Sequence, residues 1–174
     1  MSALPDAATL AGLVSNVTET ICGATFAPAD GVVRGNSILG RMVMLPISGA
    51  RDISVVLSCD GAGGQALGAA LRHCPRDQLT RAMIDDAIAE LLNMVAGQIQ
   101  TALEIDQPLG LPRPTSLAEL SQSGGVGFED AILLTSPALG DIKLWIFETH
   151  PASQTPTLKV RRGMFTSLFR KLND

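Results

Sequence analysis

The stretch IDDAIAELLNMVAGQIQTAL, residues 84–103, constrains the fold more than any other feature of the sequence. Its apolar residues recur every three or four positions, so they lie on one face of a helix. A long helix with a single apolar face must pack that face against another layer of secondary structure. The pattern therefore predicts a helix over residues 81–104. Its buried face is expected to consist of Ile84, Ile88, Leu91, Val95 and Ile99.

Three further segments before this helix show clear patterns. Residues 6–22 place apolar side chains on one helical stripe, and Gly23 follows as a helix stop. Two β-branched and apolar runs, residues 37–47 and 52–60, enclose a turn-rich stretch and predict an antiparallel hairpin. The alanine-rich segment 64–74 predicts a short helix.

The segments after the long helix predict a second hairpin. Strands are expected at residues 131–136 and 141–148, with a turn between them. The proline-rich stretch after the helix is expected to be extended, and the glycine-rich loop 121–127 to be mobile. The order of elements lacks the regular alternation of strands and helices that a parallel sheet requires. We therefore predict the α/β class in its broad, α+β sense, with two long amphipathic helices packed on an antiparallel or mixed sheet.

The length of the chain limits the number of domains. With 174 residues it can bury one sizeable core but is short for two ordinary domains. We expect residues 1–150 to form one domain and residues 151–174 to form a basic amphipathic tail. Three roles are open for this tail: packing back on the domain, docking to a partner protein, or contact with an acidic membrane surface.

Composition disfavours several functional classes. A net charge of -4 and an aromatic content of 3% provide neither a positive field nor stacking platforms for nucleic acid. The N-terminus does not resemble a secretory signal, and no apolar run approaches the roughly 20 residues that cross a bilayer. A soluble, cytoplasmic protein is therefore expected.

The cysteines and histidines do not indicate a metal site. Cys22, Cys59 and Cys74 lack CxxC spacing and are expected to be buried thiols. The two histidines, His73 and His150, cannot build a multi-histidine metal site.

The sequence CDGAGGQA resembles a phosphate-binding loop in its spacing alone. Gly61, Gly63 and Ala66 satisfy the pattern G-x-G-x-x-G/A after a predicted strand. A dinucleotide fold then requires a second parallel strand after the helix, whereas here a second helix follows. We therefore expect a flexible turn between strand and helix at these glycines.

The polar residues of the long helix form a stripe opposite its apolar face. Asp86, Glu90, Asn93 and Gly97 are spaced by three or four residues, and this spacing aligns them on a helix. The simplest interpretation is an ordinary solvated face. However, glycine within a helix is less favourable than alanine by about 1 kcal/mol, which suggests close approach of another molecule. Adaptable methionines such as Met94 border the stripe, so it is predicted to be a contact surface.

These residues resemble the signature helix of the CheX and CheC phosphatases of bacterial chemotaxis. That motif has Asp or Ser, then Glu, Asn and usually Gly, and the four stripe residues match every position. The similarity covers roughly residues 6–148, with Pro112 and Pro114 as candidates for a proline of the family. A second copy of the motif in the first helix would consist of Ser15, Glu19 and Cys22, but Cys22 replaces the Asn. One working helix is the CheX-like pattern.

The resemblance implies a CheC-like fold and a chemical role for the stripe. The substrate would be the aspartyl phosphate of a CheY-like receiver, with Asn93 orienting the attacking water and Glu90 reaching the receiver's lysine. Asp86 would steer the partner, and Gly97 and Met94 would contact it. The chain itself is expected to bind no metal or cofactor, because Mg²⁺ belongs to the receiver. Some relatives are dimers, and an exposed strand edge would make a homodimer reasonable.

Two other functional classes remain as alternatives. A non-catalytic adaptor could bind a phosphorylated receiver through the same helix. A component of the flagellar switch could use the basic tail as its main element.

Overall fold

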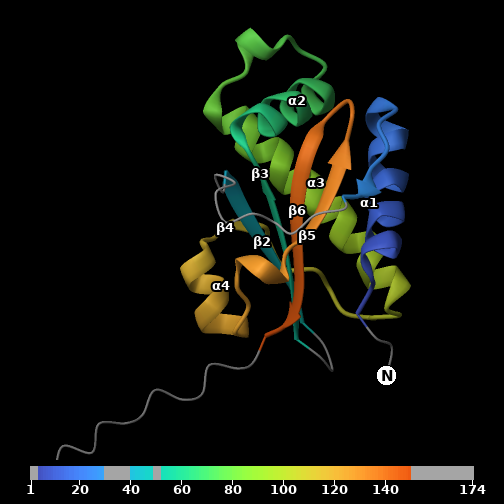
Figure 1. Cartoon of the computed structure of the whole chain (residues 1–174), viewed down its shortest axis with the longest axis vertical. Coiled ribbons are helices and arrows are strands. Elements are labelled where there is room, and N and C mark those ends of the chain that lie inside the picture. The colour runs from blue at the N-terminus through green and yellow to red at the C-terminus, as the bar shows by residue number, and fades with distance from the viewer. Residues whose placement is uncertain (1–3, 30–39, 49–51, 150–174) are drawn as a thin grey trace, which may run out of the picture.

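The computed structural model describes residues 4–29, 40–48 and 52–149. Within these ranges a six-stranded sheet carries helices on both of its faces (Figure 1). The helices are α1 (Ala7–Cys22), α2 (Gly61–Arg72), α3 (Arg81–Ala102) and α4 (Leu117–Gly124), with short 3₁₀ helices η1 (Arg76–Gln78) and η2 (Phe128–Asp130). The strands are β1 (Ala27–Pro28), β2 (Arg41–Ile47), β3 (Ile53–Cys59), β4 (Arg113–Pro114), β5 (Ile132–Ser136) and β6 (Gly140–Glu148).

Every neighbouring pair of strands in the sheet is antiparallel, in the order β1-β5-β6-β3-β2-β4. Two hairpins, β2–β3 and β5–β6, meet where β3 pairs with β6. This arrangement confirms the predicted class and both predicted hairpins. All of β3 is buried, as expected for a central strand with side chains packed on both faces.

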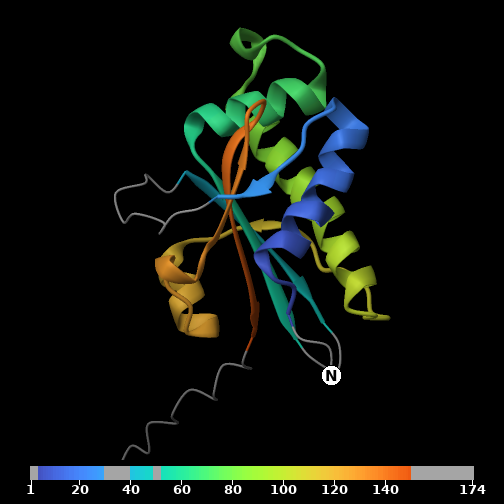
Figure 2. The same cartoon turned by 45° about the vertical axis from the view of Figure 1, so that its right-hand side comes forward.

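Side chains alternate between two hydrophobic clusters along the central strands. Val55 pairs with Ile146 under α1 and α3, whereas Val56 and its partner Trp145 point to the opposite face. Figures 1 and 2 show α1, α2 and α3 together on one face, with α4 apart from them on the other. The larger core therefore lies beneath the long helices, and α4 closes the smaller one with Leu120.

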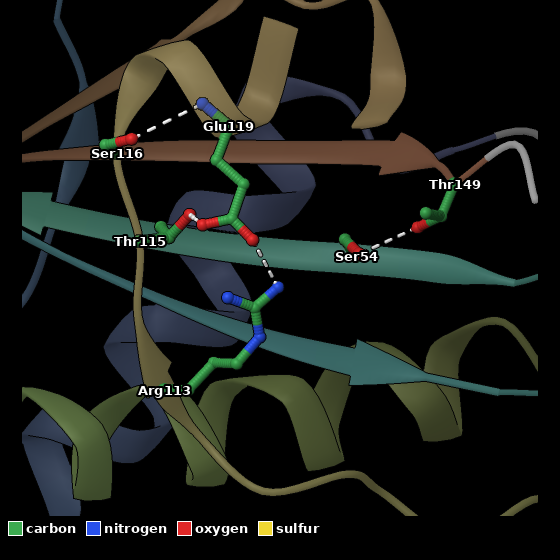
Figure 3. A network of polar contacts seen from close by, with 6 residues as sticks. All are labelled: Ser54, Arg113, Thr115, Ser116, Glu119 and Thr149. Carbon is green, nitrogen blue, oxygen red and sulfur yellow. Dashed lines mark hydrogen bonds and ion pairs between the residues drawn. The ribbon is translucent and has the colours of Figure 1, made fainter. Parts of the chain in front are cut away.

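Helix α4 includes residues 121–124 of the segment 121–127 that the sequence predicted to be a glycine-rich loop, so the loop prediction is wrong for those residues. Its first turn is capped by Ser116, whose hydroxyl accepts from the Glu119 amide at 3.3 Å (Figure 3). Glu119 is held from the other side by Arg113 at 2.5 Å and by Thr115 at 2.8 Å. The helix ends at Gly125, in the left-handed conformation that favours glycine.

Hydrogen bonds from Arg113 and then Thr115 hold the pKa of Glu119 below its ordinary value. The Arg113 side chain belongs to β4, so this carboxylate ties the helix to one edge of the sheet. A separate hydrogen bond of 2.8 Å between the hydroxyls of Ser54 and Thr149 links the ends of β3 and β6 in the same view (Figure 3).

Helix α2 begins earlier than predicted, because Asp60 caps it. The Asp60 carboxylate accepts from the Gly63 amide at 2.6 Å, so the glycines form the first helical turn and not a flexible loop. Close packing also favours glycine there. A Cβ on Gly64 would lie 3.1 Å from Ile84 Cγ2 and 3.4 Å from Cys59 Sγ.

Both edges of the described sheet are strands of two residues, and each contains a proline, Pro28 or Pro114. The apolar strands that suggested an exposed edge are therefore flanked by other strands. Proline cannot donate to a neighbouring strand, which limits pairing with a second copy at these edges. The homodimer stays a prediction, but these edges give it no support.

Candidate functional site on helix α3

Helix α3 is set firmly on the sheet by its cap and its apolar face. The Thr80 hydroxyl accepts from the Met83 amide at 3.2 Å at its start. Seven of its residues are buried: Ala87, Ile88, Leu91, Leu92, Val95, Ala96 and Ile99. Because these contacts fix the rotation of the helix about its axis, they also fix which residues face outwards.

The polar stripe points away from this core. Asp86, Glu90 and Asn93 are exposed, and Gly97 is half-buried. The side chains of Asp86 and Glu90 are 71% and 52% exposed. Asn93 makes no side-chain hydrogen bond within the described ranges, which leaves both its oxygen and its NH₂ group available to a water or a partner.

Gly97 has open space above it. A Cβ at this position would meet no heavy atom within 4 Å. Packing within the described part of the chain therefore does not require a glycine here, in contrast to Gly64. The glycine leaves a flat patch on the stripe that another molecule can approach closely.

The methionines beside the stripe are half-buried. Met94 also packs against the larger core, so it is both a support and a border of the stripe. Its adaptable side chain suits a surface where a partner docks.

Arg72, the last residue of α2, lies over the stripe and was not among the residues predicted from the sequence. Its Nη2 atom is 3.9 Å from Asp86 Oδ2 and 3.8 Å from Glu90 Oε2. The available signal was the position of an arginine at a helix C-terminus, where the helix dipole favours a cation. That signal does not identify the partners, because they depend on the packing of α2 against α3.

The second copy of the motif on α1 is engaged in structural contacts. The Ser15 hydroxyl donates to the Phe26 carbonyl at 3.1 Å and accepts from the Phe26 amide at 2.8 Å. The thiol of Cys22 points back to the Thr18 carbonyl at 3.2 Å. Of these three residues only Glu19 is exposed, so this second copy of the motif offers no available amide.

The remaining sequence candidates are dispersed. His73 is the left-handed C-cap of α2, Pro114 lies in β4, and His150 falls outside the described residues together with the tail. Of the three cysteines only Cys59 is buried, while Cys22 and Cys74 are partly exposed, so the prediction of three buried thiols is only partly correct.

The described residues hold no group of three or more histidine, cysteine, aspartate or glutamate side chains arranged for a metal ion. None of the helices within the described ranges is both long and apolar enough to cross a bilayer.

Comparison with known proteins places this geometry in a family. Residues 41–126, which include α2 and all of α3, match the family model described as chemotaxis phosphatase CheX. No curated protein matches the chain.

Solved structures share the fold. The chemotaxis protein CheX from Desulfovibrio desulfuricans is 19% identical with a TM-score of 0.54, over 80% of this chain and 95% of that one. The CheX protein from Vibrio vulnificus is 15% identical with a TM-score of 0.59, over 85% and 99%. A CheX-CheY-BeF3-Mg complex from Borrelia burgdorferi provides a match at 17% identity and a TM-score of 0.57, over 81% and 96%. At these identities the likeness establishes the CheC-like fold.

Proposed function

Because this chain belongs to the CheX/CheC family, we propose that it hydrolyses the aspartyl phosphate of a CheY-like receiver domain. One observation carries the proposal. Glu90 and Asn93 stand one turn apart on the exposed side of a helix whose opposite side is locked in the core. Two polar side chains in this relation can enter one pocket of a partner together.

The reaction requires little covalent chemistry from this chain. Water attacks the phosphorus atom, and the bond between phosphorus and the aspartate oxygen breaks. The aspartate leaves as a carboxylate, and both protons of the water end on inorganic phosphate. Mg²⁺ held by the receiver would neutralise charge on the phosphoryl oxygens. What the receiver lacks is a water held in line for attack.

Asn93 is the proposed catalytic residue. Its side-chain oxygen can accept a hydrogen bond from the attacking water, and its NH₂ group can donate to a phosphoryl oxygen. Since an amide takes no proton permanently, its role is orientation and not general-base catalysis.

Glu90 is proposed to pair with a lysine of the receiver. A charge-assisted hydrogen bond of this kind fixes the register of the two proteins and supplies binding energy. Asp86, one turn earlier, would add to the negative field that attracts the same cation. Gly97 and Met94 would form the close-packed end of the contact.

The presence of CheY in the Borrelia complex supports the class of partner. An adaptor that binds the receiver without hydrolysis differs from a phosphatase in turnover, so kinetics separate the two.

The test measures phosphate loss from phosphorylated CheY-like receivers of the same organism, with catalytic amounts of this protein. We expect multiple turnovers, and we expect Asn93→Ala to lower kcat by about 100-fold or more while binding changes little. Asn16→Ala is the matched control, because Asn16 is an exposed asparagine on α1. Full activity of Asn93→Ala would refute the mechanism. Stoichiometric binding without turnover would favour the adaptor.

A further inference from the structure

Arg72 places a positive charge midway between the two acids of the stripe. Its Nη2 atom lies at nearly equal distances from Asp86 Oδ2, 3.9 Å, and Glu90 Oε2, 3.8 Å. Asp86 and Glu90 are one helical turn apart, and like charges at this spacing repel each other. A single guanidinium between them offsets that repulsion.

Stability does not explain this arrangement. All three side chains are well exposed, Arg72 at 37%, and exposed ion pairs contribute little to folding. Both distances also exceed those of charge-assisted hydrogen bonds, which are about 2.7–2.9 Å. Arg72 therefore orients the acids through its field and leaves the acceptor lone pairs of Glu90 open to a partner.

We propose that Arg72 is a positioning residue that holds the Glu90 carboxylate ready for the cation of the receiver. This inference rests on the proposed function, because it assigns Glu90 the task of capturing that cation. Without Arg72, the carboxylates of Asp86 and Glu90 repel each other, and their side chains occupy several rotamers. Docking must then order the Glu90 side chain at an entropic cost.

The expected signature is a change in KM and not in kcat. Asn93, the residue proposed to orient the water, forms no hydrogen bond with Arg72 within the described ranges. Arg72→Gln should raise the KM for the phosphorylated receiver about three- to fivefold, the range of an exposed ion pair, with kcat within about twofold of the wild-type value. Arg72→Lys should restore most of the loss, because the interaction is one of charge and not of bidentate geometry.

Arg76→Gln is the matched control. Arg76 is an exposed arginine on η1 and has no ion pair with the stripe in the described part of the chain. Its substitution removes the same charge as Arg72→Gln. It should leave both constants unchanged. A double-mutant cycle completes the test: in the Glu90→Gln background, Arg72→Gln should have little further effect on KM.

Three results would overturn the inference while leaving the proposed function intact. They are equal effects of Arg72→Gln and Arg76→Gln, a lower KM in Arg72→Gln, and full additivity of Arg72→Gln with Glu90→Gln. The last would mean that Arg72 acts on the partner independently of Glu90. If the wild-type protein neither accelerates phosphate loss nor binds any beryllofluoride-activated receiver, the proposed function fails, and this inference fails with it.

Discussion

The hydroxyl of Thr101 donates a hydrogen bond of 3.0 Å to the backbone carbonyl of Gly97, one turn earlier on the same helix. Helix α3 therefore continues through its glycine without a break, to Ala102. The glycine does not serve as a hinge or a helix end. We therefore attribute the glycine to the open surface above it, where a Cβ would meet no heavy atom within 4 Å.

Gly97→Ala should stabilise the protein and weaken the proposed phosphatase activity. The added Cβ meets nothing within 4 Å, and alanine is a better helix former by about 1 kcal/mol. The same methyl group would obstruct a receiver that packs closely on the stripe, raising KM. Gly12→Ala is the control, because Gly12 lies within α1 and its Cβ would also meet nothing within 4 Å. Urea unfolding and receiver kinetics of both variants test the prediction; unchanged kinetics in Gly97→Ala would show that nothing approaches there.

Asp60→Ala should destabilise the protein by about 1 kcal/mol through loss of the cap on α2. The first turn of this helix is rich in glycine and has little helical propensity of its own. Asp60→Asn should retain most of the stability, because asparagine also caps well. The midpoint of urea unfolding distinguishes the two variants, and Asp77→Ala on the exposed η1 serves as a reference. Equal stability of Asp60→Ala and the wild type would contradict the assigned cap.

Glu119 should contribute to stability at neutral pH and not in acid. Its pKa is lowered in the folded protein, so its contribution is present above the unfolded value of about 4.3 and is lost as the pH falls through the folded value. Glu119→Gln should therefore be less stable than the wild type at pH 7, by less than about 1 kcal/mol given its exposure. The two proteins should converge in acid, once the pH is below the folded pKa of Glu119.

Trp145, the single tryptophan of the chain, is the fluorescence probe of unfolding for this comparison. It is buried beneath Leu120, and its indole N–H donates to the Gly127 carbonyl at 2.9 Å. Urea unfolding followed by its fluorescence at both pH values is the measurement, with Glu104→Gln as an exposed control. A difference between Glu119→Gln and the wild type that persists in acid would point to a cause other than charge.

Cys59 should resist alkylation until the protein unfolds. Burial, with a smaller effect from the charge of Asp60, raises the pKa of its thiol to about 12. Iodoacetamide at pH 8 should label the partly exposed Cys22 and Cys74 first, as read by mass spectrometry. The same shift adds stability that is complete below the unfolded thiol pKa of about 8.5 and is lost as the pH rises toward 12. Early labelling of Cys59 would mean that the sheet opens near it.

The exposed stripe could be predicted from sequence because α3 has strong and opposite patterns on its two faces. The helix period alone separates the buried Leu91 from the exposed Asn93. Helix α4 was missed because its glycines suggested a loop. Its S-x-x-E signal, Ser116 followed by Glu119, is the local feature that could have identified it.

Arg72 was beyond the reach of sequence patterns for a different reason. Its acidic neighbours belong to another helix, and the distances among the three residues depend on how α2 crosses α3. Close approach of the two helices occurs at Gly64 and Gly68, where an added Cβ would lie 3.1 Å and 3.5 Å from the Ile84 side chain. Pairing at the edge of the sheet, such as that of Pro114 with Val43, is likewise a tertiary property that local periodicity does not encode.

Glu90 and Asn93 are carried by one uninterrupted helix that is anchored along its whole buried face. No hinge lies between them, so the relative position of these two side chains does not depend on the opening and closing of a lid. Under the proposed function, the remaining step is the association of this preformed helix face with the receiver. Under the proposed function, turnover should therefore follow how often receivers arrive and how quickly they leave, and a change of partner would require only a few altered side chains without rebuilding the fold.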